Sequence, residues 1–147
     1  MQKLNLPSYS FTISEQETGS YIFDIIRKKY VKLDPEEWVR QHFIHYLIQE
    51  LHYSKTLISC ESGLKYNSLL KRSDILVYDQ HLSPYLLVEC KAPAVSLNQQ
   101  TLIQASMYNK TIKAPHIAIT NGLQHFAFKI DVESGKSEQL NSFPPSA

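Results

Sequence analysis

Three charged residues stand at the ends of two neighbouring apolar segments of the chain. Asp74 opens one segment, DILVY, and Glu89 and Lys91 close the other, YLLVECK. Two carboxylates suit a hard divalent ion such as Mg²⁺, which takes oxygen ligands and often binds only one or two carboxylates. An ammonium group beside that ion can hold an attacking water or stabilise charge that develops on a phosphorus centre. These residue types therefore suit the attack of a water molecule, beside a divalent ion, on a phosphorus centre.

Two predicted strands would bring these charges together. The segments on either side of residues 80–83 are rich in apolar side chains, and the connection between them, QHLS, suits a hairpin. If Tyr78 pairs with Tyr85, Asp74 lies directly opposite Glu89, where Cβ atoms are about 4.5–5.5 Å apart. Carboxylates placed in this way repel each other unless a cation lies between them. The register therefore predicts a metal site at one end of the hairpin.

A simpler interpretation treats each charge separately. Asp74 could be a turn or cap residue, and Glu89 and Lys91 could form an exposed cross-strand charge pattern. Any one of these residues, taken alone, is more often a solvated surface group than a catalyst. Together they favour a functional site, because charge at the end of an apolar central strand is uncommon without a partner.

Two helices are predicted around the hairpin. The first begins at Asp34-Pro35, which supplies an N-cap and a proline at the first helical position, and its apolar stripe continues to about residue 52. The second spans residues 96–110, with Ser96 as its cap. Residues 21–33 suit either a strand pair or a helical turn.

The remaining elements are strands, and the order of elements predicts the fold class. Helix, three strands, helix and two strands follow one another, which indicates an α/β domain with a mixed sheet of about five strands flanked by helices. Residues 1–147 are expected to form one domain whose ends, 1–20 and 135–147, pack loosely. The predicted strands span residues 56–62, 69–79, 84–92, 115–120 and 123–130.

The composition sets limits on the function. The chain has 147 residues, 15 basic and 14 acidic side chains and a net charge of +1, so any polyanion site must come from local clustering. Its start lacks the apolar core of a signal peptide, and no apolar run approaches the roughly 20 residues that span a bilayer. A cytoplasmic protein without a membrane segment is therefore expected. Cys60 and Cys90 lie in apolar segments and are expected to be buried free thiols.

The charged residues and their flanking elements resemble a known nuclease pattern. Asp74 and Glu89-Cys90-Lys91 resemble the D…(D/E)xK motif of the PD-(D/E)xK nuclease superfamily, and the order of elements resembles its restriction-endonuclease-like core. More narrowly, residues 21–135 resemble the N-terminal nuclease domain of type I restriction enzyme R subunits. The segments that carry this resemblance are PEEWVRQHFI, KRSDILVYD, LLVECKAP, QASMYN and TNG.

The resemblance implies a Mg²⁺-dependent DNA endonuclease, with Mn²⁺ as a substitute ion. Asp74 and Glu89 would ligate the ion, and Lys91 would assist the nucleophilic water. An acid on the first helix often completes such sites, and Glu37 matches it best, as both a metal ligand and a catalytic residue, with Glu36 as the fallback. Acids in a first turn also have an ordinary explanation, because they stabilise the helix dipole. DNA is the implied partner, together with other subunits of a restriction system.

A second set of residues is implied to contact DNA. Gln104 and Tyr108 match a Gln-x-x-x-Tyr motif of some nucleases in this superfamily, and their i,i+4 spacing puts them on one helix face with Gln100. Lys71 and Arg72 precede the hairpin and could contact a DNA backbone, although two adjacent basic residues are more often a solvated strand end.

The chain departs from the resembling proteins in two ways. Ser73 rather than proline precedes Asp74, and no P-loop of an ATP-driven motor occurs in the sequence. The fold could therefore also serve as a module that no longer cuts and instead binds nucleic acid or docks on a restriction or translocase partner. Cleavage by the purified protein, and its loss in Lys91→Ala, would distinguish these alternatives.

Overall fold

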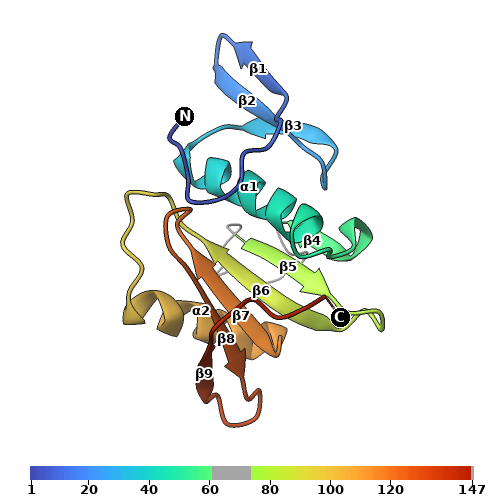
Figure 1. The fold of residues 1–147 in the computed structure, drawn as a ribbon, viewed down its shortest axis with the longest axis vertical. Helices are drawn as coiled ribbons and strands as arrows, with labels where there is room; N and C mark the ends of the chain where they lie inside the picture. Colours follow the sequence, from blue (N-terminus) through green and yellow to red (C-terminus); the bar gives the residue numbers. More distant parts are fainter. Residues whose placement is uncertain (61–73, 147) are drawn as a thin grey trace.

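A six-stranded mixed sheet carries the predicted hairpin. A computed structural model describes residues 1–60 and 74–146 of the chain, with Asp74 described through its backbone only (Figure 1). The strands of this sheet are β4 (Ile58–Cys60), β5 (Asp74–Tyr78), β6 (Pro84–Cys90), β7 (His116–Thr120), β8 (His125–Ile130) and β9 (Ser137–Leu140). They lie side by side in chain order, and neighbours are antiparallel except for the parallel pair β6 and β7.

Two α-helices cover opposite faces of this sheet (Figure 1). α1 (Pro35–Gln49) lies on one face and α2 (Gln99–Ile112) on the other. α2 also supplies the crossover between β6 and β7, because a tight turn cannot join parallel neighbours. The side chains of β6 alternate accordingly: Leu86 and Val88 pack in the cluster under α1, whereas Leu87 packs in the cluster under α2.

The α/β fold class is confirmed, and the predicted order of helix, three strands, helix and two strands is found with two additions: three strands before α1, and β9, which makes the larger sheet six-stranded instead of about five-stranded. Residues 21–33 form strands, which settles the alternative that their sequence leaves open. They belong to an antiparallel three-stranded sheet on the side of α1 that faces away from the larger sheet (Figure 1). Its strands are β1 (Ile13–Gln16), β2 (Gly19–Asp24) and β3 (Lys29–Lys32), and a short 3-10 helix, η1 (Lys55–Leu57), precedes β4.

The two ends of the chain, which are expected to pack loosely, each contain a paired strand. At the N-terminus, Leu4 is 5% exposed and belongs to the core cluster under α1, and β1 pairs with β2. At the C-terminus, β9 pairs with β8 at the edge of the larger sheet. These segments look loose in sequence because they are polar, but they take part in backbone pairing and core contacts.

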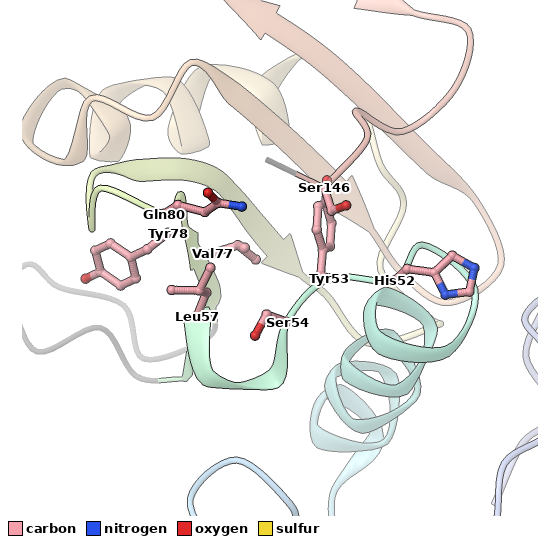
Figure 2. A pocket seen from close by; sticks show the side chains of 8 residues that line it. All are labelled: His52, Tyr53, Ser54, Leu57, Val77, Tyr78, Gln80 and Ser146. Atoms are coloured by element: carbon pink, nitrogen blue, oxygen red, sulfur yellow. The ribbon is translucent and has the colours of Figure 1, made fainter.

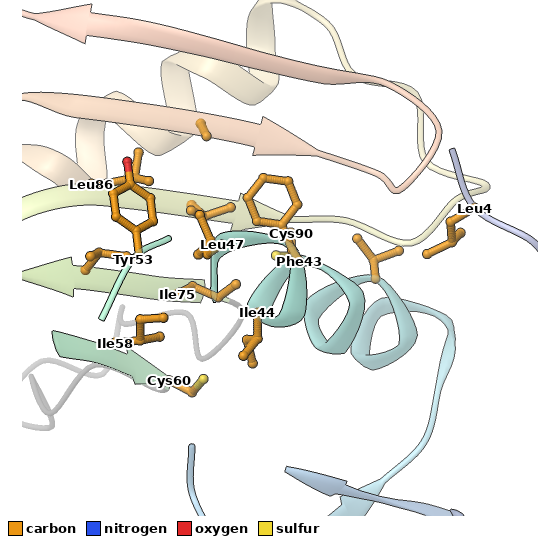
Figure 3. Packing of buried hydrophobic residues seen from close by; sticks show 14 residues of the cluster. Leu4, Phe43, Ile44, Leu47, Tyr53, Ile58, Cys60, Ile75, Leu86 and Cys90 are labelled. Atoms are coloured by element: carbon orange, nitrogen blue, oxygen red, sulfur yellow. The ribbon is translucent and has the colours of Figure 1, made fainter. Parts of the chain in front are cut away.

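The start and the buried face of α1 match their sequence signals. The Asp34 carboxylate accepts a hydrogen bond from the backbone N–H of Glu37 at 2.7 Å, and Pro35 occupies the first turn. Phe43 and Leu47, from the predicted apolar stripe, are fully buried. Figure 3 shows them in one cluster with Ile44, Tyr53, Ile58, Cys60, Ile75, Leu86 and Cys90.

Cys60 and Cys90 are buried free thiols, as predicted. Among the helices of the described ranges, none is long and apolar enough to cross a membrane. The predicted cap of the second helix is wrong, because α2 begins at Gln99 with Asn98 as its N-cap instead of Ser96.

The cap of α2 is a reciprocal pair of hydrogen bonds. The Asn98 side-chain oxygen accepts from the Thr101 backbone N–H at 3.2 Å, and the Thr101 hydroxyl accepts from the Asn98 backbone N–H at 3.3 Å. Such a capping box satisfies two backbone donors at once. Ser96 lies two residues too early to make either bond, so the helix starts later than its sequence suggests.

The β5–β6 hairpin has the predicted pairing at its open end and a different one at its turn. Asp74 pairs with Glu89, as predicted, whereas Tyr78 pairs with Pro84 instead of Tyr85. The turn is tightened by hydrogen bonds from two of its backbone N–H groups to the carboxylate that opens it. This tight turn is accompanied by a register shift, which residue alternation alone does not predict.

Candidate functional site

Glu89 is the buried centre of the candidate site. It lies near the end of β6, opposite the backbone position of Asp74, and it is 2% exposed. The Lys91 Nζ atom lies 3.6 Å from Glu89 Oε2, and the Lys91 side chain is 20% exposed. The Lys91 backbone N–H donates to the Thr120 carbonyl at 2.8 Å, which ties the end of β6 to β7. The site thus joins a buried carboxylate to an ammonium group that solvent can reach.

Glu36, in the first turn of α1, belongs to the same cluster of charge. Burial raises the pKa of its carboxyl. The positive charges of Arg40 and Lys91 lower this pKa, and the carboxylates of Asp34 and Glu89 raise it. Arg40 Nη2 lies 4.0 Å from Glu36 Oε2, and the Glu36 side chain keeps 34% of its surface exposed. Glu36 is therefore close enough to Glu89 and Lys91 to feel both of their charges.

The neighbouring acid, Glu37, is engaged in a different set of contacts. Its carboxylate accepts hydrogen bonds from Arg40 at 2.6 Å and from Gln41 at 2.8 Å, and it lies 3.5 Å from Arg27. Its side chain is only 8% exposed. A metal-ligating and catalytic role for Glu37 stays a prediction, whereas Glu36 is the more exposed of the two acids and lies within electrostatic range of Lys91 and Glu89.

Asp24 completes a buried polar network around Glu37. Its carboxylate accepts hydrogen bonds from the backbone and side chain of Arg27 and from Gln41 at 3.1 Å. Burial works to raise the pKa of Asp24, but the hydrogen bonds and charge of Arg27 outweigh it and hold that pKa below its ordinary value. The sequence gives no motif for this network, since its only signal is an acid and a base three residues apart within residues 21–33.

The predicted DNA-contacting residues of α2 lie in two environments. Gln100 and Gln104 are exposed on the outer side of the helix. Tyr108 is half-buried and packs against the cluster that holds Leu76 and Leu87, on the face of the sheet opposite to α1. Tyr108 therefore packs against the same two strands that carry the candidate site, whereas the two glutamines face outward.

Part of the predicted site lies outside the described residues. Lys71 and Arg72 belong to that part, and the side chain of Asp74 is likewise not described. Among the side chains that the structure does describe, no group of three His, Cys, Asp or Glu residues is arranged to hold a metal ion. The chemistry of the donors nevertheless suits Mg²⁺, because Glu89 and Glu36 supply carboxylate oxygens beside a directly paired aspartate position.

A pocket of about 220 Å³ lies at the other end of β5, near the hairpin turn (Figure 2). It is bordered by the segment after α1, by η1 and by the C-terminal residues. Its position at the Tyr78 end of β5 separates it from the charged cluster at the Asp74 end. The residues that line it are His52, Tyr53, Ser54, Leu57, Val77, Tyr78, Gln80 and Ser146.

Fold and site together define a mixed α/β domain in which Glu89 and Lys91, at the end of β6, lie within electrostatic range of Glu36 at the start of α1. The family model of the type I restriction enzyme R protein N terminus (HSDR_N) matches residues 35–144, which run from α1 past β9. The chain therefore belongs to this family. No curated protein and no solved structure matches the chain significantly.

Proposed function

We propose that this domain is a Mg²⁺-dependent DNA endonuclease domain of a restriction system, in which Asp74, Glu89 and Glu36 hold the ion. The observation that carries the proposal is the direct pairing of Asp74 with Glu89 beside the Lys91 ammonium group. Membership of the R protein N-terminus family supports the restriction context. Hydrolysis of phosphodiester bonds in DNA is the reaction that these groups serve best.

The proposed site consists of carboxylates that would bind the metal ion and of one hydrogen-bond donor, the Lys91 ammonium group. Mg²⁺ bound by the carboxylates would lower the pKa of a water and neutralise charge on the scissile phosphate. Lys91 remains partly exposed at 3.6 Å from Glu89, so its ammonium group can donate hydrogen bonds to the attacking water or to a phosphate oxygen. The burial of Glu89 strengthens these interactions, because solvent screens charges weakly at a buried position.

Nicking of supercoiled plasmid by the purified protein tests the proposal. The wild type should nick the plasmid with Mg²⁺ or Mn²⁺ and should be inactive in EDTA. Lys91→Ala should lower the nicking rate by about 10²-fold or more, because it removes the group that orients the water. Lys136→Ala, which removes an exposed lysine before β9, is the matched control and should keep the wild-type rate.

A wild-type protein that is as inert as Lys91→Ala with each metal and each form of DNA would contradict the proposal. The same fold would then serve a module that binds nucleic acid or docks on a restriction or translocase partner without cutting. Metal titration of both proteins in the absence of DNA would show whether an inactive protein fails to bind the metal ion or binds it without cleaving DNA.

A further inference from the structure

The turn between β2 and β3 carries exposed residues that the proposed site does not use. Lys28 is the last residue of that turn, and Lys29 and Tyr30 are the first residues of β3; we call these three residues the basic turn. All three are exposed, Tyr30 to 44%. Within the described ranges, no ion pair involves either lysine. The basic turn precedes residues 35–144 and so lies outside the segment that the family model matches.

The charges of the buried network next to the basic turn balance one another. Arg27 lies 2.7 Å from the Asp24 carboxylate, and Arg40 lies 2.6 Å from the Glu37 carboxylate. Two carboxylates therefore meet two guanidinium groups in the buried network. Lys28 and Lys29 therefore form a local excess of positive charge, in a chain whose net charge is only +1. Local clusters of this kind attract polyanions even when the whole protein is nearly neutral.

Hydrogen bonds before the basic turn, and the pairing of Lys29 with Asp24 and of Tyr30 with Phe23, hold it in one conformation. The Asp24 carboxylate accepts from the backbone N–H groups of Ile26 at 2.8 Å and Arg27 at 2.9 Å. The backbone N–H of Lys28 donates to the Asp24 carbonyl at 2.7 Å. A preformed loop loses little conformational freedom when a ligand binds, so more of the interaction energy appears as affinity.

The basic turn is linked through Arg27 to the first turn of α1, which also carries Glu36. Arg27, directly before it, lies 3.5 Å from Glu37, which is the neighbour of Glu36 in α1. The Tyr30 ring packs edge-on against Phe23, with centroids 5.4 Å apart, and keeps an exposed surface beside the lysines. Lysines next to an exposed aromatic ring are the combination that grips phosphates and stacks on bases.

We propose that the basic turn contacts nucleic acid, with Lys28 and Lys29 binding backbone phosphates and Tyr30 stacking against a base or sugar. The inference rests on the proposed function, because the same DNA would pass the metal site. It adds a binding surface from the N-terminal sheet to a domain whose matched segment starts at α1.

Fluorescence anisotropy with labelled single-stranded and double-stranded DNA, in EDTA, tests the surface without relying on cleavage. Lys28→Gln/Lys29→Gln should weaken binding to both probes about threefold to tenfold and lower the slope of log affinity against log salt by about 1 to 2. Lys129→Gln/Lys136→Gln removes the same charge from the β8–β9 hairpin and should change neither. Tyr30→Ala should weaken binding to the single-stranded probe more than binding to the double-stranded probe. Thermal melting checks that each variant is folded.

The inference is overturned if the wild type binds neither probe, if Lys28→Gln/Lys29→Gln or Tyr30→Ala binds both probes as the wild type does, or if the two double-lysine variants lose affinity equally. Plasmid nicking separates this failure from a failure of the proposed function. A wild type that binds DNA through the basic turn but never nicks would overturn the proposed function alone. Nicking by a wild type whose binding ignores the basic turn would overturn only the inference.

Discussion

At the scale of single residues, the difference between Glu36 and Glu37 decides how the proposed site is built. Successive residues of an α-helix point about 100° apart, so two adjacent acids face different neighbours. Glu36 feels the charges of Lys91 and Glu89, whereas Glu37 is bonded to Arg40 and lies near Arg27. The sequence favours Glu37 as the metal ligand, because the spacing of the residues does not reveal that Arg27, ten residues upstream, contacts the Glu37 carboxylate.

Paired substitutions of these two acids should therefore have opposite effects. Glu36→Gln should weaken Mn²⁺ binding about tenfold or more, since even groups that only support a ligand commonly contribute that much. Glu37→Gln should keep the Mn²⁺ affinity and lower the free energy of unfolding by about 3 kcal/mol, because it leaves buried guanidinium charge uncompensated. Mn²⁺ titration by electron paramagnetic resonance and urea unfolding measure the two effects. The reverse pattern would return the ligand role to Glu37.

At the scale of elements, the cap of α2 controls where the helix that carries Tyr108 begins. Asn98→Ala should lower the free energy of unfolding by about 1 kcal/mol, because it leaves the Thr101 backbone N–H without its partner. Ser96→Ala is the matched control, since Ser96 is the cap that the sequence suggests and the structure does not use. Urea denaturation of both variants measures the difference, and an equal loss in the two would mean that the helix starts earlier than described.

The face of α1 turned toward the N-terminal segment contains two buried histidines. The Phe11 ring lies 4.8 Å from the His42 ring and 5.0 Å from the His45 ring, and Tyr9 stacks on His45 at 5.3 Å. Burial lowers the pKa of both histidines below the ordinary value of 6.5, and the charge of His42 lowers that of His45 further. Protonation is thus more favourable in the unfolded chain than in this cluster.

The sign of the resulting pH dependence follows from linkage. A histidine with a depressed folded-state pKa contributes its full stability above the unfolded value, and this contribution is lost as the pH falls through the folded-state pKa. The melting temperature should therefore drop between about pH 7.5 and about pH 5.5. The drop should be smaller in His42→Gln/His45→Gln, and His81→Gln, at an exposed position, should keep it. An equal drop in all three proteins would place the pH dependence elsewhere.

At the scale of the whole molecule, local sequence patterns predict the helices and strands but not the contacts between distant segments. The pairing of Asp74 with Glu89 is predictable, because a slip of one residue would turn the apolar side chains of the hairpin to the wrong face of the sheet. The register at Tyr78 is not, since it depends on the hydrogen bonds of one turn. Two other features join segments that are distant in the sequence: the contact of Arg27 with Glu37 and the packing of both chain ends. Neither feature has a periodic sequence pattern that would predict it.

The C-terminal segment is the clearest case of such a long-range contact. The Tyr53 hydroxyl donates to the Pro144 carbonyl at 2.5 Å, across a separation of 91 residues. The Tyr85 hydroxyl donates to the Pro145 carbonyl at 2.6 Å. One tyrosine follows α1 and the other lies in β6, so the segment connects the helix side of the core to the strand that carries Glu89.

Phe143 should therefore contribute to the stability of the whole domain. Its half-buried ring lies 5.4 Å from the ring of Phe43 and 5.9 Å from that of Tyr46, so Phe143→Ala should lower the free energy of unfolding by about 2 kcal/mol. Ser146→Ala, at an exposed position of the same segment, should change it by less than about 0.5 kcal/mol. Urea denaturation measures both. If Phe143→Ala unfolds at the wild-type midpoint, the C-terminus is the loosely packed tail that its composition suggests, and the contacts with Phe43 and Tyr46 add nothing to folding.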